Sequence, residues 1–219
     1  MIEKRQFYIN GSWVDPIAGK ACDVIDPSTE EAVATISLGG QADTDAAVAA
    51  AKAALPAWRA LSVADRIAYV RNILEVYTER QHDMAKAMSL EMGAPIDFSL
   101  EEQVSSGDSH IRGFLKAVQG FEWEHRLNGK AGTRIIKDPI GVVGMITPWN
   151  WPMNQVTLKA IPALITGCTM VLKPSEIAPL SSLLFAEIVD AAGVPAGVFN
   201  LVNGDGVGVG SQLSVHPDV

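Results

Sequence analysis

The stretch IGVVGMITPWNWP, residues 140–152, decides the fold of this sequence. Its apolar first half predicts a buried strand, and the second half places Asn150 between two tryptophans and two prolines. Pro148 and Pro152 restrict the backbone on both sides, which fixes Asn150 at the end of the strand. A neutral amide there is suited to donate a hydrogen bond to an oxygen that gains negative charge during a reaction. The alternative is that Asn150 caps the following helix, and the local residues alone favour that alternative.

The sequence from residue 140 onward alternates between apolar strand-like runs and helical stretches. This order predicts a parallel, right-handed, doubly wound α/β sheet, Rossmann-like but incomplete. Such sheets bind ligands beyond the carboxyl ends of their strands, so the residues that follow each strand are candidates for a binding site. The predicted strands are 140–146, 169–172 and 198–202, and the predicted helices are 153–165 and 180–192.

The second predicted strand ends in VLKPSE, residues 171–176. An acidic residue in this position of a doubly wound sheet often accepts hydrogen bonds from the ribose diol of an adenosine, which is the role predicted for Glu176. Lys173 is placed to bind the same sugar or a phosphate on it, and Ser175 is a second candidate for such a phosphate. The alternative is a surface turn with a weak ion pair.

The third predicted strand leads into NGDGVGVGSQL, residues 203–213. Gly204 and Gly206 lie in a glycine-rich turn that enters a helix, where backbone amides can meet a phosphate. The run does not match the G-x-G-x-x-G pattern, and its alternative is a flexible turn. The helix cap, the surface turn and the flexible turn are each plausible alone. All three would have to be correct at successive strand ends of one sheet, so together the three ends favour a binding site.

The amino-terminal part is predicted to be a β-ribbon followed by helices. Asn10-Gly11 separates two β-rich runs and indicates a tight hairpin within a ribbon over residues 1–40. Ser62 with Asp65 indicates a helix start, and Gly93 indicates a helix stop. The predicted ranges are a helix over 43–55 that ends at Pro56, further helices within 62–93, one helix over 98–118 with weak points at Gly107 and Gly113, and a return to β structure over 132–139.

The composition excludes several classes of function. The 219 residues carry a net charge of −8, which together with the lack of a basic cluster argues against nucleic-acid binding. Apolar stretches are too short for a membrane span, and no secretory signal precedes the first strand. The two cysteines, Cys22 and Cys168, are far apart and in no metal-ligand spacing. They are predicted to be reduced thiols of a cytoplasmic protein with no metal site.

The run PWNWP, followed by KAIPALITGCTMVLKPSE, PLSSLLFAEIVDAAGVPAGVFNLVNGDG and the final HPDV, resembles the aldehyde dehydrogenase superfamily. The similarity includes FYINGSWV and the DPSTEE turn, so it covers essentially the whole chain. The resemblance implies an oxidoreductase that converts an aldehyde to a carboxylic acid with NAD, or with NADP, through a cysteine thioester. It also implies a homo-oligomer, with residues 1–40 and 120–139 as oligomerisation elements, 41–119 as a helical segment and 140–219 as the first part of the cofactor domain.

The resemblance implies a role for each candidate residue. Asn150 would stabilise the oxyanion of the covalent intermediates. Lys173 and Glu176 would bind the adenosine ribose, and Gly204 and Gly206 would let the following helix approach the adenine and pyrophosphate. Three residues, Trp151, Gln155 and Leu158, would share a helix face on the aldehyde tunnel or simply pack in the core, and Lys159 would relay protons or support Asn150. Ile146, Thr147, Pro148 and Trp149 would line the cofactor cleft.

The nucleophilic cysteine and the general-base glutamate of the family would follow Val219. Cys168 is predicted to lie at the opposite end of its strand from the site, and Cys22 lies in the ribbon. The sequence is therefore expected to be the amino-terminal part of such an enzyme and inactive by itself. Glu176 favours NAD over NADP, because a carboxylate disfavours a 2′-phosphate. Two other functions stay open, a dinucleotide-binding module and an assembly element.

Overall fold

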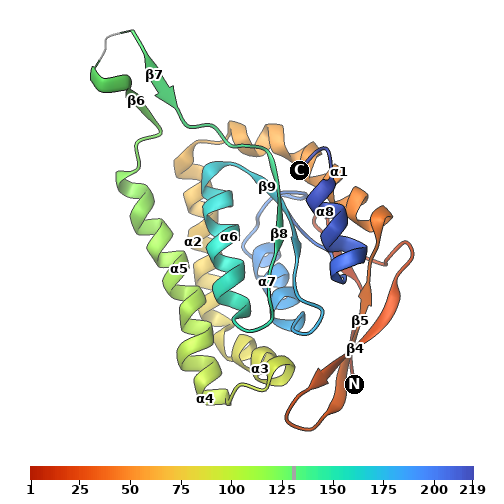
Figure 1. Ribbon diagram of the computed structural model, residues 1–219. Coiled ribbons are helices and arrows are strands. Elements are labelled where there is room, and N and C mark those ends of the chain that lie inside the picture. Colours follow the sequence, from red (N-terminus) through yellow and green to blue (C-terminus); the bar gives the residue numbers. More distant parts are fainter. Residues whose placement is uncertain (130–131) are drawn as a thin grey trace.

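The computed structural model describes residues 1–129 and 132–219, and a five-stranded sheet forms its centre (Figure 1). The strand order is β3-β2-β10-β9-β8. Three of these strands are parallel, which confirms the predicted doubly wound sheet: β8 (Val142–Ile146), β9 (Thr169–Lys173) and β10 (Phe199–Leu201). In register, Ile146 lies opposite Lys173 and Leu172 lies opposite Leu201.

The sheet separates two hydrophobic cores because side chains alternate along its strands. Met170 and Leu172 join the larger core, which includes α6 (Pro152–Thr166) and α7 (Leu180–Ala191), the two crossover helices. Val171 joins a smaller core with Ala47, Val48 and Ala51 of α1 (Gln41–Ala60) on the opposite face. Every residue of β9 is buried, as expected for a parallel strand covered on both faces.

The amino-terminal hairpin completes this sheet rather than forming a ribbon of its own. Strands β2 (Phe7–Ile9) and β3 (Ser12–Val14) pair antiparallel, and Asn10 and Gly11 between them have φ of 53° and 73°, as the predicted tight turn requires. β2 also pairs antiparallel with β10. The buried amide of Asn200 fixes this join, since it accepts from Asn10 N at 2.9 Å and donates to the carbonyl of Met170 in β9 and to that of Gly197 before β10.

The remaining strands of residues 1–40 form a second, three-stranded sheet in the order β1-β5-β4. β4 (Lys20–Asp26) and β5 (Glu31–Leu38) are antiparallel, and β1 (Ile2–Lys4) runs parallel to β5. The predicted Asp26-Pro27-Ser28 turn joins β4 to β5, with Asp26 Oδ1 accepting from the amide and hydroxyl of Ser28. Residues 1–40 are therefore divided between two sheets.

Helices α2 (Val63–Glu79) and α3 (Gln81–Met92) keep their predicted caps, but α1 does not keep its predicted bounds, since it begins at Gln41 and not at Asp43. Ser62 caps α2 by accepting from Asp65 N at 3.1 Å, and Gly93, with φ of 72°, ends α3. The expectation that α1 stops at Pro56 is wrong, because the helix continues to Ala60. Trp58 in its last turn is 1% exposed, and burial of that indole stabilises a turn that proline alone would weaken.

The predicted helix over 98–118 is a composite of three helical pieces. It begins with α4 (Ile96–Phe98), passes through the π-helical turn η1 (Ser99–Val104) and continues as α5 (Ser105–Ala117). The expected weak point Gly107 lies inside α5, where it is buried against Tyr77. Its lack of a side chain permits close packing of α5 on α2.

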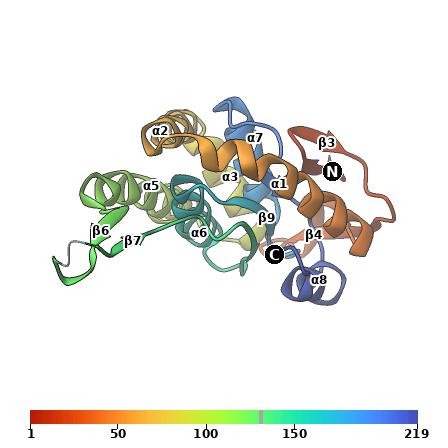
Figure 2. The same cartoon turned by 90° about the horizontal axis from the view of Figure 1, so that it is seen from above.

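A small hairpin projects beside α5, on the opposite side of the molecule from α8 (Ser211–Val215) (Figures 1 and 2). Its strands are β6 (Glu124–Arg126) and β7 (Arg134–Ile136), and the 3-10 turns η2 (Val118–Gly120) and η3 (Leu127–Gly129) flank β6. The return to β structure is thus confirmed. Residues 130 and 131 of the predicted ribbon lie outside the described residues.

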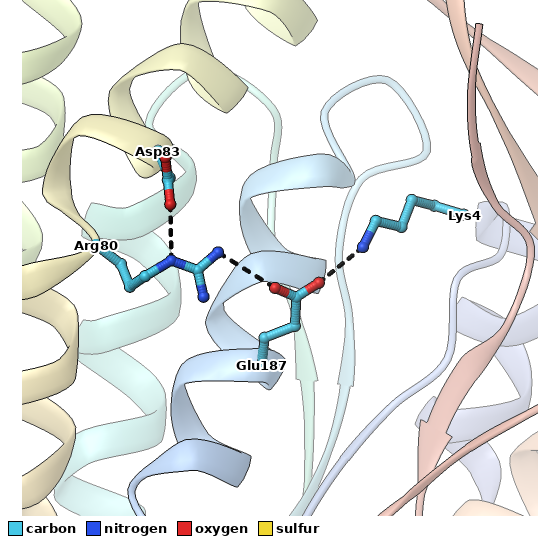
Figure 3. A network of polar contacts seen from close by, with 4 residues as sticks. All are labelled: Lys4, Arg80, Asp83 and Glu187. Carbon is cyan, nitrogen blue, oxygen red and sulfur yellow. Dashed lines mark hydrogen bonds and ion pairs between the residues drawn. The ribbon is translucent and has the colours of Figure 1, made fainter.

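An ion-pair network joins β1 of the three-stranded sheet to α7 and to the junction of α2 and α3 (Figure 3). Glu187 Oε1 of α7 lies 2.7 Å from Lys4 Nζ of β1, and Glu187 Oε2 lies 3.4 Å from Arg80 Nη2. Arg80 Nε also lies 2.7 Å from Asp83 Oδ2. Pairs as exposed as these contribute little energy each. Their effect is to orient β1 against the junction of α2 and α3. None of the helices in the described ranges has the length and apolarity needed to cross a bilayer.

Candidate cofactor and active site

The carboxyl ends of the three parallel strands meet at one edge of the sheet. Thr147 N, just past β8, donates to Lys173 O at 3.2 Å, and Val202 N, just past β10, donates to Leu172 O at 3.0 Å. These bonds carry the sheet register into the loops that follow the strands. The structure therefore brings together, at one edge, the loops that carry the predicted site residues.

The first loop presents Asn150 to the surface. Asn150 is exposed. The N-cap of α6 is Trp151, so Asn150 does not cap this helix. The backbone carbonyl of Asn150 accepts from Gln103 Nε2 at 3.4 Å. Asn150 is thus an exposed residue at a strand end, and its role as an oxyanion donor stays a prediction.

The other residues of this loop divide into anchors and lining groups. Thr147 is 4% exposed and is fixed to β9, whereas Ile146 and Trp149 are 46% and 48% exposed. Pro148 is also exposed. Large apolar side chains left open beside a fixed backbone form a surface that suits a flat, partly apolar ligand.

The second loop contains a half-buried ion pair. Lys173, the last residue of β9, is 4% exposed, and its Nζ lies 3.0 Å from Glu176 Oε2. The Glu176 side chain is 34% exposed, so part of the carboxylate is open to a ligand. Ser175 is buried, and its hydroxyl oxygen accepts from Ile177 N at 3.2 Å. The pair is therefore anchored and is not the loose surface contact of the alternative interpretation.

The third loop only partly matches its prediction. A Cβ at Gly206 would meet nothing within 4 Å, so a ligand can approach this backbone closely. At Gly204 a Cβ would lie 2.2 Å from Val209 Cγ2, so this glycine is required by internal packing. The following turn η4 (Gly206–Gly210) is capped by Asp205, whose carboxylate accepts from Gly208 N. A backbone amide that was expected to face a phosphate is thus already bonded to an acidic group.

The two thiols lie in different surroundings. Cys168, 3% exposed, enters β9 at the end opposite Lys173, as predicted. Cys22 of β4 is half-buried; burial, with added repulsion from the charges of Glu176, Asp23 and Asp205, raises the pKa of its thiol. A thiol with a raised pKa is a weak nucleophile at neutral pH. Among the described residues no group of His, Cys, Asp and Glu side chains is arranged to hold a metal ion.

The candidate tunnel residues lie along α6 beside the first loop. Trp151 is half-buried and meets Phe98 edge-on, with ring centroids 5.9 Å apart. Gln155 Oε1 accepts from Lys159 Nζ at 2.8 Å, and burial lowers the pKa of Lys159. Leu158 is 37% exposed. The contacts of Lys159 are with Gln155, so its predicted support of Asn150 stays a prediction.

Sequence reasoning missed two residues of this edge. Gln103 lies 47 positions before Asn150, and no local pattern connects the two. Asp205 did carry a signal, because an aspartate three residues before a helical amide is a common N-cap arrangement. The surrounding glycines instead indicated a phosphate-binding or flexible turn.

The chain is similar to known proteins over nearly all of its length. The model of the aldehyde dehydrogenase family matches residues 13–219. A 3-succinoylsemialdehyde-pyridine dehydrogenase of Pseudomonas sp. is 45% identical over 100% of this chain and 46% of its own length. A crystal structure of aldehyde dehydrogenase from Bartonella henselae has a TM-score of 0.99 and 59% identity, covering 100% of this chain and 46% of that one.

A mutant of aldehyde dehydrogenase C from Pseudomonas syringae, solved with NAD+ and octanal, has a TM-score of 0.95 and 45% identity over 98% of this chain and 44% of that one. The chain thus spans about half the length of the relatives it matches, such as the 46% of the Pseudomonas dehydrogenase. The matches nevertheless extend over nearly all of its own residues, and the resemblance seen in the sequence is confirmed. The chain belongs to the aldehyde dehydrogenase family.

Proposed function

We propose that this chain forms the adenosine-side wall and the oxyanion donor of an enzyme that oxidises an aldehyde to a carboxylic acid with NAD through a cysteine thioester. The observation that carries the proposal is the convergence of three strand ends, with the amide of Asn150 exposed at the same edge as the Lys173–Glu176 pair. The likeness to a structure solved with NAD+ and octanal supports the same chemistry.

The cofactor-binding residues fit a nucleoside better than a second phosphate. Glu176 keeps a partly open carboxylate that can accept from a ribose diol, while Lys173 holds it in place. Asp205 adds a negative charge at the neighbouring loop, which disfavours a 2′-phosphate. Lys173 and Ser175 are the groups that such a phosphate would use, but the lysine is already paired and the serine is buried. We therefore propose NAD as the preferred cofactor, which would serve as the oxidant.

Asn150 supplies the electrostatic part of the reaction in this proposal. A carboxamide donates without losing a proton and has no charge to compete with, so it stabilises an oxygen as that oxygen becomes negative. Removing one such donor in other enzymes lowers kcat by about 10²–10³-fold. We expect a loss of that order from Asn150→Ala in the complete enzyme, with little effect on cofactor binding.

This chain by itself is expected to give no turnover. Cys168 is buried at the far end of β9, and Cys22 has a raised pKa and lies in β4. Neither thiol is placed to attack a carbonyl held by Asn150. Incubation with an aldehyde and NAD should produce no NADH, and aldehyde-dependent NADH formation by the pure chain would contradict this expectation.

Binding of NAD by the chain can be measured directly through Trp149. Its indole is 48% exposed at the proposed cleft, so we expect NAD to quench tryptophan fluorescence and Trp149→Phe to remove most of that response. Glu176→Gln should weaken NAD binding by about tenfold or more, since hydrogen bonds to a charged group are worth about 1.5–3 kcal/mol. The matched control is Glu31→Gln, an exposed glutamate on β5. A flat titration up to millimolar NAD would refute the binding proposal.

A second candidate function, as an assembly element, is favoured by the projecting hairpin. Ile136 on β7 is 59% exposed, and the base of the hairpin borders an apolar groove of about 270 Å³. Exposed apolar surface of this kind promotes association. We expect the chain to self-associate in light scattering, and Ile136→Lys to reduce that association; a monomer at all concentrations would argue against this candidate. The groove is lined by Phe114, Ala117, Val118, Phe121, Trp123, Pro162, Ile165 and Thr166.

A further inference from the structure

We propose that Gln103 is a positioning residue that fixes the backbone of Asn150, an inference that rests on the proposed role of Asn150. Gln103 is 1% exposed, and its Nε2 donates to the backbone oxygen of Asn150 at 3.4 Å. The two residues belong to different elements, η1 and the loop before α6. A buried side chain thus reaches out of a helix to bind the main chain of the residue that carries the exposed amide.

The π-helical turn explains how this contact arises. Residues 99–104 form a single π turn between α4 and α5, and such a turn accommodates an extra residue and changes the direction of the side chains that follow it. Phe98, the last residue of α4 and the one directly before this turn, makes a second contact with the loop, edge-on to Trp151. Two consecutive loop residues, Asn150 and Trp151, are therefore held by one irregular helical segment.

The orientation of the Gln103 amide follows from its partner. Asn150 contributes a carbonyl oxygen, so the NH₂ group must face it, and the opposite orientation would place two oxygens together. The Oε1 atom of Gln103 is then buried without a hydrogen-bond partner. An unpaired buried acceptor is unfavourable for folding. A glutamine that only filled space would leave both ends of its amide unpaired, whereas donation to the Asn150 carbonyl satisfies one of them.

In this proposal the backbone and the side chain of Asn150 have different roles. Its carbonyl is bonded toward the interior, so the loop has a defined backbone position while the side-chain amide stays at the surface. Preorganised donors stabilise charge because they need no reorganisation during the reaction. Loss of the Gln103 contact should leave the donor present but poorly placed.

Gln103→Glu tests the contact because the two side chains have the same shape. When ionised, the introduced carboxylate cannot donate and repels the Asn150 carbonyl; when protonated, it can donate again. The experiment records ¹⁵N spectra of the labelled chain, following the side-chain NH₂ of Asn150 and the backbone N–H of Trp151, across a pH titration. We expect both signals to be displaced at high pH and to return toward their wild-type positions as the pH is lowered.

Gln103→Met is the matched control, since it fills similar volume and never donates. Its Asn150 and Trp151 signals should be displaced at every pH, and this variant also reports on the contact if Gln103→Glu fails to fold. Signals that stay at the wild-type position in folded Gln103→Met, or a displacement in Gln103→Glu that does not reverse on acidification, would overturn the positioning role. Failure of the proposed function would look different: NAD would leave the tryptophan fluorescence unchanged while the Gln103-dependent displacements persisted.

Discussion

Replacement of Glu91 by glutamine should remove a large part of the pH dependence of folding. Glu91 lies on α3, is 1% exposed and accepts hydrogen bonds from the backbone amides of Leu180 and Ser181, at the start of α7. It therefore caps α7 from a different helix. Because the loop with Ser175 and Glu176 ends where α7 begins, this carboxyl group also fixes the end of the second site loop.

The magnitude follows from the pKa of Glu91. Burial raises it from 4.5 to about 7, although the hydrogen bonds from Ser181 and Leu180 act in the opposite direction. The folded state thus holds the proton more tightly than the unfolded state. Its contribution to stability is complete below pH 4.5 and is lost as the pH rises through about 7. The free energy of unfolding should fall by about 3 kcal/mol over that window on account of this one group.

Urea unfolding at a series of pH values, followed by tryptophan fluorescence, measures the effect. Glu91→Gln keeps an oxygen to accept from the α7 amides but cannot ionise. The stability difference, variant minus wild type, should therefore become more favourable to the variant by about 3 kcal/mol between pH 4.5 and pH 8. Glu31→Gln, exposed on β5, is the control and should leave the wild-type profile unchanged.

Two results would refute this reasoning. Parallel stability profiles for wild type and Glu91→Gln would show that the carboxyl group ionises alike in the folded and unfolded states. A difference that grows in the opposite direction, with the variant losing stability as the pH rises, would show that the positive end of α7 stabilises the carboxylate more than burial destabilises it. Either outcome would show that burial does not dominate the ionisation of Glu91, despite its 1% exposure.

Two further substitutions test close packing and a buried cation. Gly107→Ala should destabilise the chain by about 1–3 kcal/mol in urea unfolding, because its Cβ would press against Tyr77 Oη; Gly113→Ala, with open space around it, should instead stabilise by up to about 1 kcal/mol. Arg66→Met should lower the free energy of unfolding by about 3 kcal/mol, because three carbonyl oxygens at the ends of α1 and α6 lose their donor. The exposed Arg71→Met on the same helix should change it by less than about 0.5 kcal/mol. Equal effects within either pair would contradict these assignments.

The parallel sheet was predictable because its strands are apolar runs, of which β9 and β10 are buried throughout. The runs at 140–146 and 169–172 are continuous and apolar, and the structure places strands at Val142–Ile146 and Thr169–Lys173. The intervening helix begins with Pro152 in its first turn and ends at Gly167, whose φ of 91° lies in the left-handed region that favours glycine. Where burial and local conformational signals agree, the pattern of residues is enough.

Elements shaped by distant contacts were not predictable in the same way. Pro56 signals a helix end, but the burial of Trp58 against other elements overrides that signal. The π turn at Ser99–Val104 has no local signature, since its residues are ordinary helix formers. Its position becomes intelligible only through the contact with Asn150, which lies far along the chain.

In the candidate site, too, contacts between residues close in sequence were predictable and contacts between distant segments were not. Lys173 and Glu176 were predictable as a pair because they are three residues apart at a strand end, and the structure joins them at 3.0 Å. The nearness of Cys22 to the charges of Glu176 and Asp205 depends on how the second sheet packs over this edge. No spacing in the sequence encodes that arrangement.

Buried residues behind the candidate site restrict the positions of its exposed groups. Asn150, Trp149 and part of Glu176 face outward, where side chains normally move freely. Each is attached to a group that cannot move: the Asn150 carbonyl to Gln103, the loop backbone to β9 through Thr147, and Glu176 to the buried amine of Lys173. Exposed side chains on a fixed backbone are the arrangement that charge stabilisation by preorganised groups requires. Substitutions of the buried Gln103 and Thr147 should therefore weaken ligand binding even though these residues are not expected to contact the ligand.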